Sequence, residues 1–438
     1  MSETAINAAA SLEKLVLRKV TRRLIPLLML LYFVAFLDRI NVGFAALTMN
    51  RDVGLSPSAF GIGSGVFFIG YFLFEVPSTV ILHKVGARFW IGRVMITWGL
   101  ISIAMAWTRG PFSFYALRLL LGVAEAGFFP GIILYLSYWF PSSHRSAVTA
   151  LFMAAAPAAG FFGSPLSGAL LQLHGLLGLH GWQWLFLAEG TPAVVLGFAC
   201  FWLLTDRPCR ASWLSPRERA WLVDALRHEE LANAERRHSS AWRAFRDWKV
   251  LVLSAAYFGT SAGLYTIGFW APLMIRGLGF SSFIVGLLVA IPNLIAVVGM
   301  VLWSRHSDQK QERYWHASVA CLIAAFGLAI AAAGGSSIVL ALIGLSLAAF
   351  GVSAAKPPLW CLPTLFFTGT GAATSIGLIN SLGTLGGFAG PYMIGVTDQS
   401  SGHFARGLDM VGGLLVLSAV TILAMRFVQA RTSAELSS

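Results

Sequence analysis

Polar and charged side chains interrupt the first long apolar stretch of the chain. Asp38, Arg39 and Asn41 lie between two runs, 24–37 and 42–49, that are almost wholly apolar. Inserting a charged residue near the centre of a membrane helix costs roughly 2.5–3.5 kcal/mol. Charged residues at such positions therefore usually face the interior of a helix bundle, where they handle ions, protons or polar ligands.

A second ionisable pair, Arg118 and Glu125, occupies another apolar segment. The two residues are seven positions apart. In a helix this is two turns, so both project from nearly the same face, about 10 Å apart along the axis. Because this distance is too long for an ion pair, we expect each to meet a partner on another helix. Asp38 and Arg39 are the available pair.

These residue types suit the binding and release of protons. A carboxyl group that alternates between a dry and a wet environment close to an arginine can change its protonation state. Asp38 and Glu125 are therefore candidates for coupling protons to transport. The alternative is a static network of salt bridges that holds the helices together.

The buried cations indicate the charge of a ligand. Arg39, Arg118 and Lys356 could meet a carboxylate, and arginine does so in a bidentate manner. An anion would bind better while Asp38 and Glu125 carry protons, which is the thermodynamic basis of symport. Lys356 could instead extend its ammonium group toward the cytoplasm.

Further polar residues stand within or near the apolar segments. Asn41, Tyr71, Trp360 and Asn380 are predicted to contact a substrate, and Tyr71 and Asn380 could instead satisfy a neighbouring helix. Glu75 precedes Pro77, and we expect it to bind a backbone group that the proline frees. We expect Glu189 and Asp409, near the ends of their segments, at the membrane interface.

The composition is that of a polytopic membrane protein. The 438 residues have a mean hydropathy of +0.73 and are 57% hydrophobic and 11% charged, whereas soluble domains average about 25% charged. The net charge of +12 does not indicate nucleic-acid binding, because the basic residues lie in loops and are not interleaved with stacking aromatic residues.

Motifs for enzymes, cofactors and metals are missing from the sequence. The four cysteines form no C-x-x-C pair, so neither a metal site nor a disulfide framework is expected. The chain also has no phosphate-binding loop, no H-E-x-x-H and no G-x-S-x-G. We therefore expect neither a cofactor, nor direct drive by ATP, nor enzyme activity.

The apolar segments predict an all-α membrane protein with 12 transmembrane helices. A helix needs about 20 residues to cross the hydrocarbon core. The predicted spans are 24–49, 59–82, 89–107, 112–140, 147–173, 182–204, 248–272, 283–303, 317–333, 338–366, 374–397 and 409–428. The tenth is the least regular, because Lys356-Pro357-Pro358 interrupts it.

Charge asymmetry places both termini in the cytoplasm. With that orientation, the loops on the opposite side contain only Arg51, Arg109, Arg276 and Arg406 of the 31 lysine and arginine residues. The predicted organisation is a cytoplasmic segment 1–23, a six-helix lobe 24–204, a linker 205–247, a second six-helix lobe 248–428 and a tail 429–438. A capping box from Ser215 to Glu218 predicts a surface helix in the linker.

Two short basic loops occupy equivalent places in the two halves. They are 82–88, which contains Arg88, and 304–313, which contains Asp308 and Arg313. Such loops can clamp the cytoplasmic ends of neighbouring helices through charge-assisted hydrogen bonds. Ordinary enrichment of positive charge on the cytoplasmic side explains them equally well.

The residues and loops described above lie in stretches that resemble the major facilitator superfamily, in particular its anion:cation symporter family. The likeness runs nearly from end to end. The matching stretches are 36–43, 70–78, 86–88, 118–131, 213–219, 305–308 and 386–392. One departure is the loop after the second span, where the usual acidic residue is absent and His83-Lys84 stand nearby.

The resemblance implies two lobes, alternating access and proton-coupled uptake of organic anions. It implies that Asp38 and Glu125 bind protons, that Arg39 and Arg118 tune them or meet substrate, and that Tyr71, Trp360 and Asn380 contact substrate. The family carries tartrate, phthalate, sugar acids and aromatic acids such as hydroxyphenylacetate or pyridine carboxylates.

The sequence therefore favours a monomeric, multi-pass symporter of the bacterial inner membrane. Its ligands would be a small organic acid and protons, and its surroundings the lipid bilayer. Two alternatives stay open at this stage. One is a proton-independent facilitator or exchanger of the same fold, and the other is a membrane sensor that binds the anion and signals through the 205–248 loop.

Overall fold

The computed structural model describes residues 3–234, 247–366, 369–401 and 404–437, and these residues form helices and no strand. The helices of the N-terminal half are α1 (Glu3–Asp52), α2 (Pro57–Val85), α3 (Ala87–Ala104), η1 (Met105–Trp107), α4 (Pro111–Glu125), α5 (Phe128–Ser137), α6 (Ser142–Met153), α7 (Ala155–Leu170), η2 (Leu171–Leu173), η3 (Leu176–Gly178) and α8 (Gly181–Leu203).

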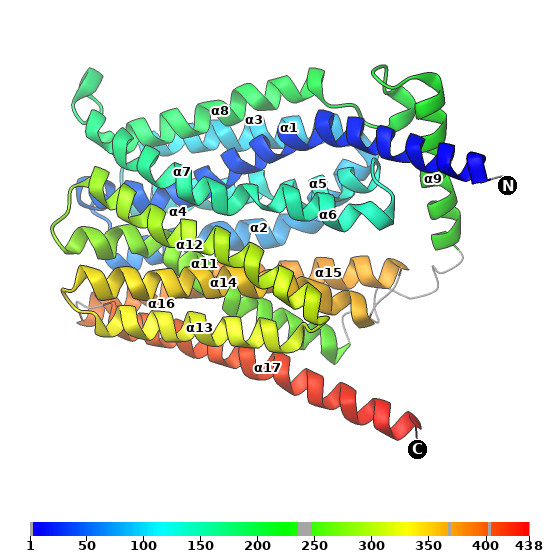
Figure 1. Ribbon diagram of the computed structural model, residues 1–438. Helices are drawn as coiled ribbons and strands as arrows, with labels where there is room; N and C mark the ends of the chain where they lie inside the picture. The colour runs from blue at the N-terminus through cyan, green and yellow to red at the C-terminus, as the bar shows by residue number, and fades with distance from the viewer. Residues whose placement is uncertain (1–2, 235–246, 367–368, 402–403, 438) are drawn as a thin grey trace.

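The chain then passes through η4 (Pro208–Arg210) and α9 (Pro216–Ala234). The helices of the C-terminal half are α11 (Trp248–Gly277), α12 (Ser282–Lys310), α13 (Tyr314–Ala333), α14 (Ile338–Phe366), α15 (Gly369–Thr384), α16 (Gly386–Ser401) and α17 (Ala405–Ser437). Figure 1 shows the two halves as two layers, with the first turns of α1, α9 and the last turns of α17 at the same end of the bundle.

Local sequence signals fix where several of these helices begin. Ser56 accepts a hydrogen bond from the backbone N–H of Ala59 at the start of α2 (3.1 Å). Asp247 accepts one from Lys249 at the start of α11 (2.9 Å). Each cap satisfies a backbone donor that the first turn of a helix leaves without a partner. Ser215 and Glu218 form the corresponding reciprocal pair at the start of α9.

The transmembrane architecture agrees with the twelve-helix prediction. Eleven helices of the described part of the chain are long and apolar enough to cross a membrane. The eleventh predicted span, 374–397, corresponds to α15 and α16, which are separated at Leu385. Gly386 stands at this break, where a Cβ atom would lie 2.0 Å from the backbone oxygen of Phe258 on α11.

The proline pair in the tenth span does not interrupt its helix. α14 continues through Pro357 and Pro358 to Phe366. The two prolines cannot donate to the carbonyl groups of Ser353 and Ala354, but packing on both sides preserves the helical path. α14 contacts α12 and α13 along much of its length.

Close backbone packing joins the two halves at the end opposite the termini. On α2, a Cβ atom at Gly61 would lie 3.1 Å from the Cα atom of Gly395 on α16. On α7, a Cβ atom at Gly168 would lie 3.2 Å from the Cα atom of Gly286 on α12. Both pairs stand near the connections 53–56, 174–180 and 278–281, so the halves meet tightly at the periplasmic end.

Candidate functional site

A buried ion pair stands at the centre of the N-terminal half. Arg39 on α1 donates through Nη2 to Oε1 of Glu125, the last residue of α4. The two residues are only 7% and 2% exposed. Glu125 thus finds its partner in the Asp38–Arg39 pair, as its position in the sequence suggested. An ion pair with so little access to water is costly to separate unless another charge replaces the lost partner.

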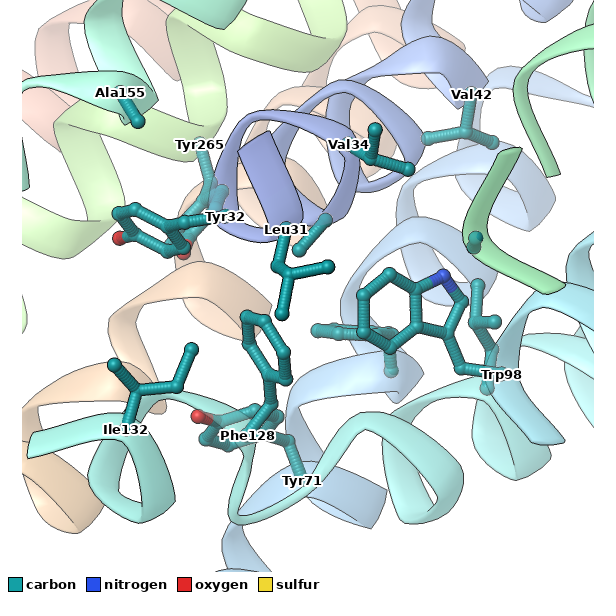
Figure 2. Close-up of a cluster of buried hydrophobic side chains, with 14 of the residues drawn as sticks. Leu31, Tyr32, Val34, Val42, Tyr71, Trp98, Phe128, Ile132, Ala155 and Tyr265 are labelled. Atoms are coloured by element: carbon teal, nitrogen blue, oxygen red, sulfur yellow. The ribbon is translucent and has the colours of Figure 1, made fainter. Parts of the chain in front are cut away.

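The guanidinium of Arg39 also reaches the C-terminal half. Its Nη1 donates a hydrogen bond to the hydroxyl of Tyr265 on α11 (3.0 Å). Its Cζ lies 5.4 Å from the ring centroids of both Phe67 and Tyr71 on α2. Figure 2 shows Tyr71 and Tyr265 in the same buried cluster. Arg39 is therefore shared between the proton-binding candidate Glu125 and the opposite half of the bundle.

A break in the fourth span sets the position of Glu125. α4 ends at Glu125 and α5 begins at Phe128. Gly127 between them has φ +83°, a left-handed conformation, and a Cβ atom there would lie 2.2 Å from Oγ of Ser78. Only glycine combines this conformation with so close an approach. The break gives the Glu125 side chain a different path from that of a residue within a continuous helix.

Arg118 is a buried cation with backbone partners. It is 1% exposed, and it donates to the carbonyl oxygens of Gly63 (3.4 Å) and Ser64 (3.0 Å) on α2. Its Cζ lies 4.9 Å from the ring centroid of Phe67. It forms no ion pair among the described residues, contrary to the expectation that it would meet Asp38 or another acid directly.

Asp38 lies in a separate polar cluster on the other side of α1. Its Oδ1 accepts hydrogen bonds from Oγ of Ser102 on α3 and from Nδ2 of Asn41 (3.0 Å). Asp38 and Asn41 are 2% and 1% exposed. The Asn41 amide therefore serves Asp38 in this conformation, although we predicted a contact with substrate.

Glu75 joins the two halves. Its carboxylate accepts hydrogen bonds from Nδ2 of Asn380 (2.5 Å) and Oγ of Ser381 (2.7 Å), both on α15. Our expectation that Glu75 binds a backbone group freed by Pro77 is wrong, because both carboxylate oxygens face side chains of the opposite half. Asn380, a predicted substrate ligand, thus stands at the boundary between the halves.

Lys356 and Trp360 lie on α14, and both are partly exposed. The Trp360 ring packs edge-on against Tyr257 of α11 with 4.9 Å between centroids. Lys356 lies within electrostatic range of Arg39. No hydrogen bond or ion pair engages its ammonium group within the parts of the chain that the structure describes.

Both of the predicted cytoplasmic clamps make polar contacts in the structure. Arg313 forms an ion pair with Asp308 of its own loop (2.6 Å). At the other loop, the backbone N–H of Arg88 donates to Oδ1 of Asp206 (2.9 Å), which thereby caps α3. No local pattern in the sequence predicts this contact, because the two residues are 118 positions apart.

Glu189 is a buried acid, and our prediction of its position is wrong. We expected it at the membrane interface, but it is 1% exposed inside the N-terminal half, where α8 packs on α1, α3 and α7. Asp409, expected at the same kind of position, is exposed. Proximity to a span end therefore did not distinguish an interfacial acid from a buried one. Among the described residues, no cluster of acidic, histidine or cysteine side chains is suited to a metal ion.

Comparisons with known proteins agree with this architecture. A family model described as Major Facilitator Superfamily matches residues 28–391. A protein of Agrobacterium vitis named "Putative tartrate transporter" is 58% identical over 95% of this chain and 96% of its own length. A "Quinolone resistance transporter" of Acinetobacter baumannii is 43% identical over 93% of this chain and 94% of its own.

Solved structures share the fold at low sequence identity. A bacterial homologue of the human lysosomal transporter Spinster, in an inward-facing and unoccupied conformation, superposes with a TM-score of 0.73 at 18% identity. The match covers 94% of this chain and 97% of that one. The arrangement of the helices in two halves is therefore a known fold.

Proposed function

The chain belongs to the major facilitator superfamily and is a multi-pass transporter of the bacterial inner membrane rather than an enzyme, and we propose that it imports a small organic carboxylate together with protons. A compound of the tartrate kind, a small hydroxy dicarboxylate, is the first candidate substrate. The relative named as a tartrate transporter is 58% identical over almost the whole chain.

Two cations without a carboxylate partner support an anionic substrate. Among the described residues, Arg118 donates only to backbone oxygens of α2, and Lys356, a partly exposed residue on α14 of the opposite half, forms no ion pair. A dicarboxylate could place one carboxylate toward each half. The gain would be large, because a buried or half-buried cation is stabilised strongly by an opposite charge.

Competition for Arg39 supports coupling to protons, and the Arg39–Glu125 pair is the observation that carries this proposal. When Glu125 takes up a proton, the ion pair is lost and Arg39 becomes available to a substrate carboxylate. When the substrate leaves, Arg39 returns to Glu125 and favours loss of that proton. Proton and anion therefore bind with positive coupling, which is the requirement for symport.

The contact of Arg39 with Tyr265 supplies a route to the conformational change. This hydrogen bond crosses from α1 to α11. A substrate that draws Arg39 away from Glu125 also changes the geometry at Tyr265. Binding at the centre can thus bias the relative position of the halves, as long as substrate binds the two conformations with different affinity.

Uptake by proteoliposomes tests the proposal. Labelled tartrate should accumulate when the lumen is alkaline, and a protonophore should abolish the accumulation. Equal initial rates with and without the pH gradient would contradict proton coupling and favour a facilitator or exchanger. Saturable binding without any entry into the vesicles would favour a sensor.

A matched pair of variants makes the same test specific to the ion pair. Glu125→Gln removes the ionisable group that Arg39 contacts, whereas Asp409→Asn changes an exposed acid near the end of its span. The first should lose gradient-driven accumulation, and the second should retain it.

A further inference from the structure

The Glu189 carboxyl group has an oxygen without a partner in the interior of the N-terminal half. Its Oε1 accepts a hydrogen bond from Oγ of Ser167 on α7 (2.7 Å). Its Oε2 is fully buried and has no hydrogen-bond partner. A buried carboxylate with one lone hydrogen bond is strongly disfavoured, whereas a protonated carboxyl group can occupy such a site.

The same polar cluster contains Asp38. Asn41 donates to Asp38 (3.0 Å) and also lies beside the Glu189 carboxyl group. The cluster is completed by Ser102 and Ser167. It is built from α1, α3, α7 and α8, which all belong to the N-terminal half, so it stands apart from the boundary where a substrate would lie.

The charges that surround the two acids do not neutralise them. Arg39 on α1 is engaged with Glu125 and Tyr265. Arg118 on α4 is within electrostatic range of Asp38, but its hydrogen bonds go to α2. On α3, Arg93 lies over the ring of Trp90, 3.8 Å from its centroid. Neither Asp38 nor Glu189 forms an ion pair among the described residues, and α7 places no charged side chain against them.

We propose that Asp38 and Glu189 together form a two-carboxyl proton site, in which Glu189 receives the proton that Asp38 releases. This rests on the proposed coupling of transport to protons. The proton leaves a carboxyl oxygen of Asp38 and binds Oε2 of Glu189, so the net charge of the pair does not change. Such a pair titrates as a unit rather than as two independent acids.

Asn41 is suited to assist this transfer. Its side chain has both a donor and an acceptor, so it can donate to the ionised carboxylate and accept from the protonated one. Asp38 then ionises without leaving two negative charges in a dry site. The pair can hold one proton while Asp38 changes its state during the transport cycle.

The variant Glu189→Gln tests the site in the full-length protein, reconstituted into proteoliposomes. Glutamine resembles the protonated side chain but cannot accept the proton from Asp38. Asp38 would then titrate without Glu189, and the charge of Glu125 would remain as an influence that disfavours its ionised form. The pH at which tartrate uptake is half-maximal should fall by about one unit, while tartrate counterflow at saturating substrate should change less than about twofold.

Two serines on α7 provide a second variant and a matched control. Ser167→Ala removes the donor to Oε1 and should move the pH profile in the same direction by a smaller amount, because ionised Glu189 loses its support. Ser164→Ala removes a buried hydroxyl that donates to the Gly160 carbonyl on the same helix. It should leave the pH profile unchanged.

Infrared spectroscopy keeps the proposal testable if Glu189→Gln is unstable. A carboxyl band of the unsubstituted protein that is shifted in Glu189→Asp, and that changes between low and high pH, supports the pair. A band that stays constant across that range, or an unchanged pH profile in Glu189→Gln, would overturn it. Absence of any gradient-driven uptake in the unsubstituted protein would instead reject the proposed symport.

Discussion

Asn380 on α15 donates a hydrogen bond to Glu75 on α2 (2.5 Å), and the two residues are 305 positions apart in the chain. Glu75 lies one turn beyond Tyr71, toward the end of α2 that faces the cytoplasm. The break at Leu385 separates α15 from α16, and α16 is the part that packs closely on α2. The Glu75 carboxylate therefore holds α15 at the boundary through side-chain contacts.

We predict that Glu75→Ala favours separation of the halves at the cytoplasmic end. Hydrogen bonds to a charged group contribute about 1.5–3 kcal/mol, so loss of two should shift the conformational equilibrium by roughly tenfold or more. A cysteine substituted for Thr384, which is 7% exposed on α15 and leaves both donors to Glu75 in place, should react faster with a maleimide when Glu75 is alanine, in a background without the native cysteines. An unchanged rate would show that the bridge does not hold this end closed.

The two proposed proton sites should affect coupling more than exchange. We predict that Asp38→Asn and Glu125→Gln abolish gradient-driven accumulation of tartrate and leave counterflow partly intact, because counterflow requires no net proton movement. Both activities are measured in the same proteoliposomes. Full accumulation in either variant would remove that residue from the proton path.

Lys356 should distinguish dicarboxylates from monocarboxylates. We predict that Lys356→Met weakens binding of tartrate at least tenfold, about 1.4 kcal/mol, and weakens binding of a monocarboxylate much less. Competition against labelled tartrate gives both affinities. If the lysine only extends its ammonium group toward the cytoplasm, the two affinities should change equally or not at all.

Gly127 should resist substitution. We expect Gly127→Ala to lower the melting temperature by several degrees, because the left-handed conformation costs a non-glycine residue about 1–2 kcal/mol and the new Cβ atom would meet Ser78. Gly377→Ala is the control, since a Cβ atom at Gly377 meets nothing within 4 Å. Equal melting temperatures for the two variants would contradict a strained backbone at the break.

Glu218 on the linker helix α9 should make a contribution to the stability of the fold that depends on pH. A hydrogen bond from Lys19 and one from the Ser215 backbone hold the pKa of Glu218 below its ordinary value of 4.5. A lowered pKa means that Glu218 stabilises the fold above pH 4.5 and that this contribution disappears as the pH falls further.

Thermal unfolding at two pH values tests this. Glu218→Gln should lower the melting temperature by about 1–3 °C near pH 7 and by less near pH 4. Lys19 is 46% exposed, which limits the effect. Asp224→Asn on the same helix should change the melting temperature by less than about 1 °C at either pH, because its ion pair with His228 is 71–76% exposed.

The sequence by itself determined the architecture of the membrane spans and the chemical types at their centre. Hydropathy is a local property, so runs of apolar residues indicate each crossing helix without knowledge of its neighbours. The cost of a charge in the membrane is equally local, and it singled out Asp38, Arg39, Arg118 and Glu125. The capping box from Ser215 to Glu218 acts within one turn, so the start of the surface helix could be predicted as well.

Only the tertiary structure decided which polar groups pair with which. Arg39 contacts Glu125, whereas Arg118 contacts backbone carbonyl groups of α2. The sequence alone left both arginines as possible partners of the acids. Glu75 meets Asn380, Asp206 caps α3, and Glu189 is buried beside Asp38 rather than at the interface. The eleventh span breaks at Leu385, whereas the tenth span continues as one helix through Pro357. Packing against α11, α12 and α13 decides which of these weak points becomes a break. These outcomes depend on distances between segments far apart in the chain, which hydropathy and spacing along a single sequence do not contain.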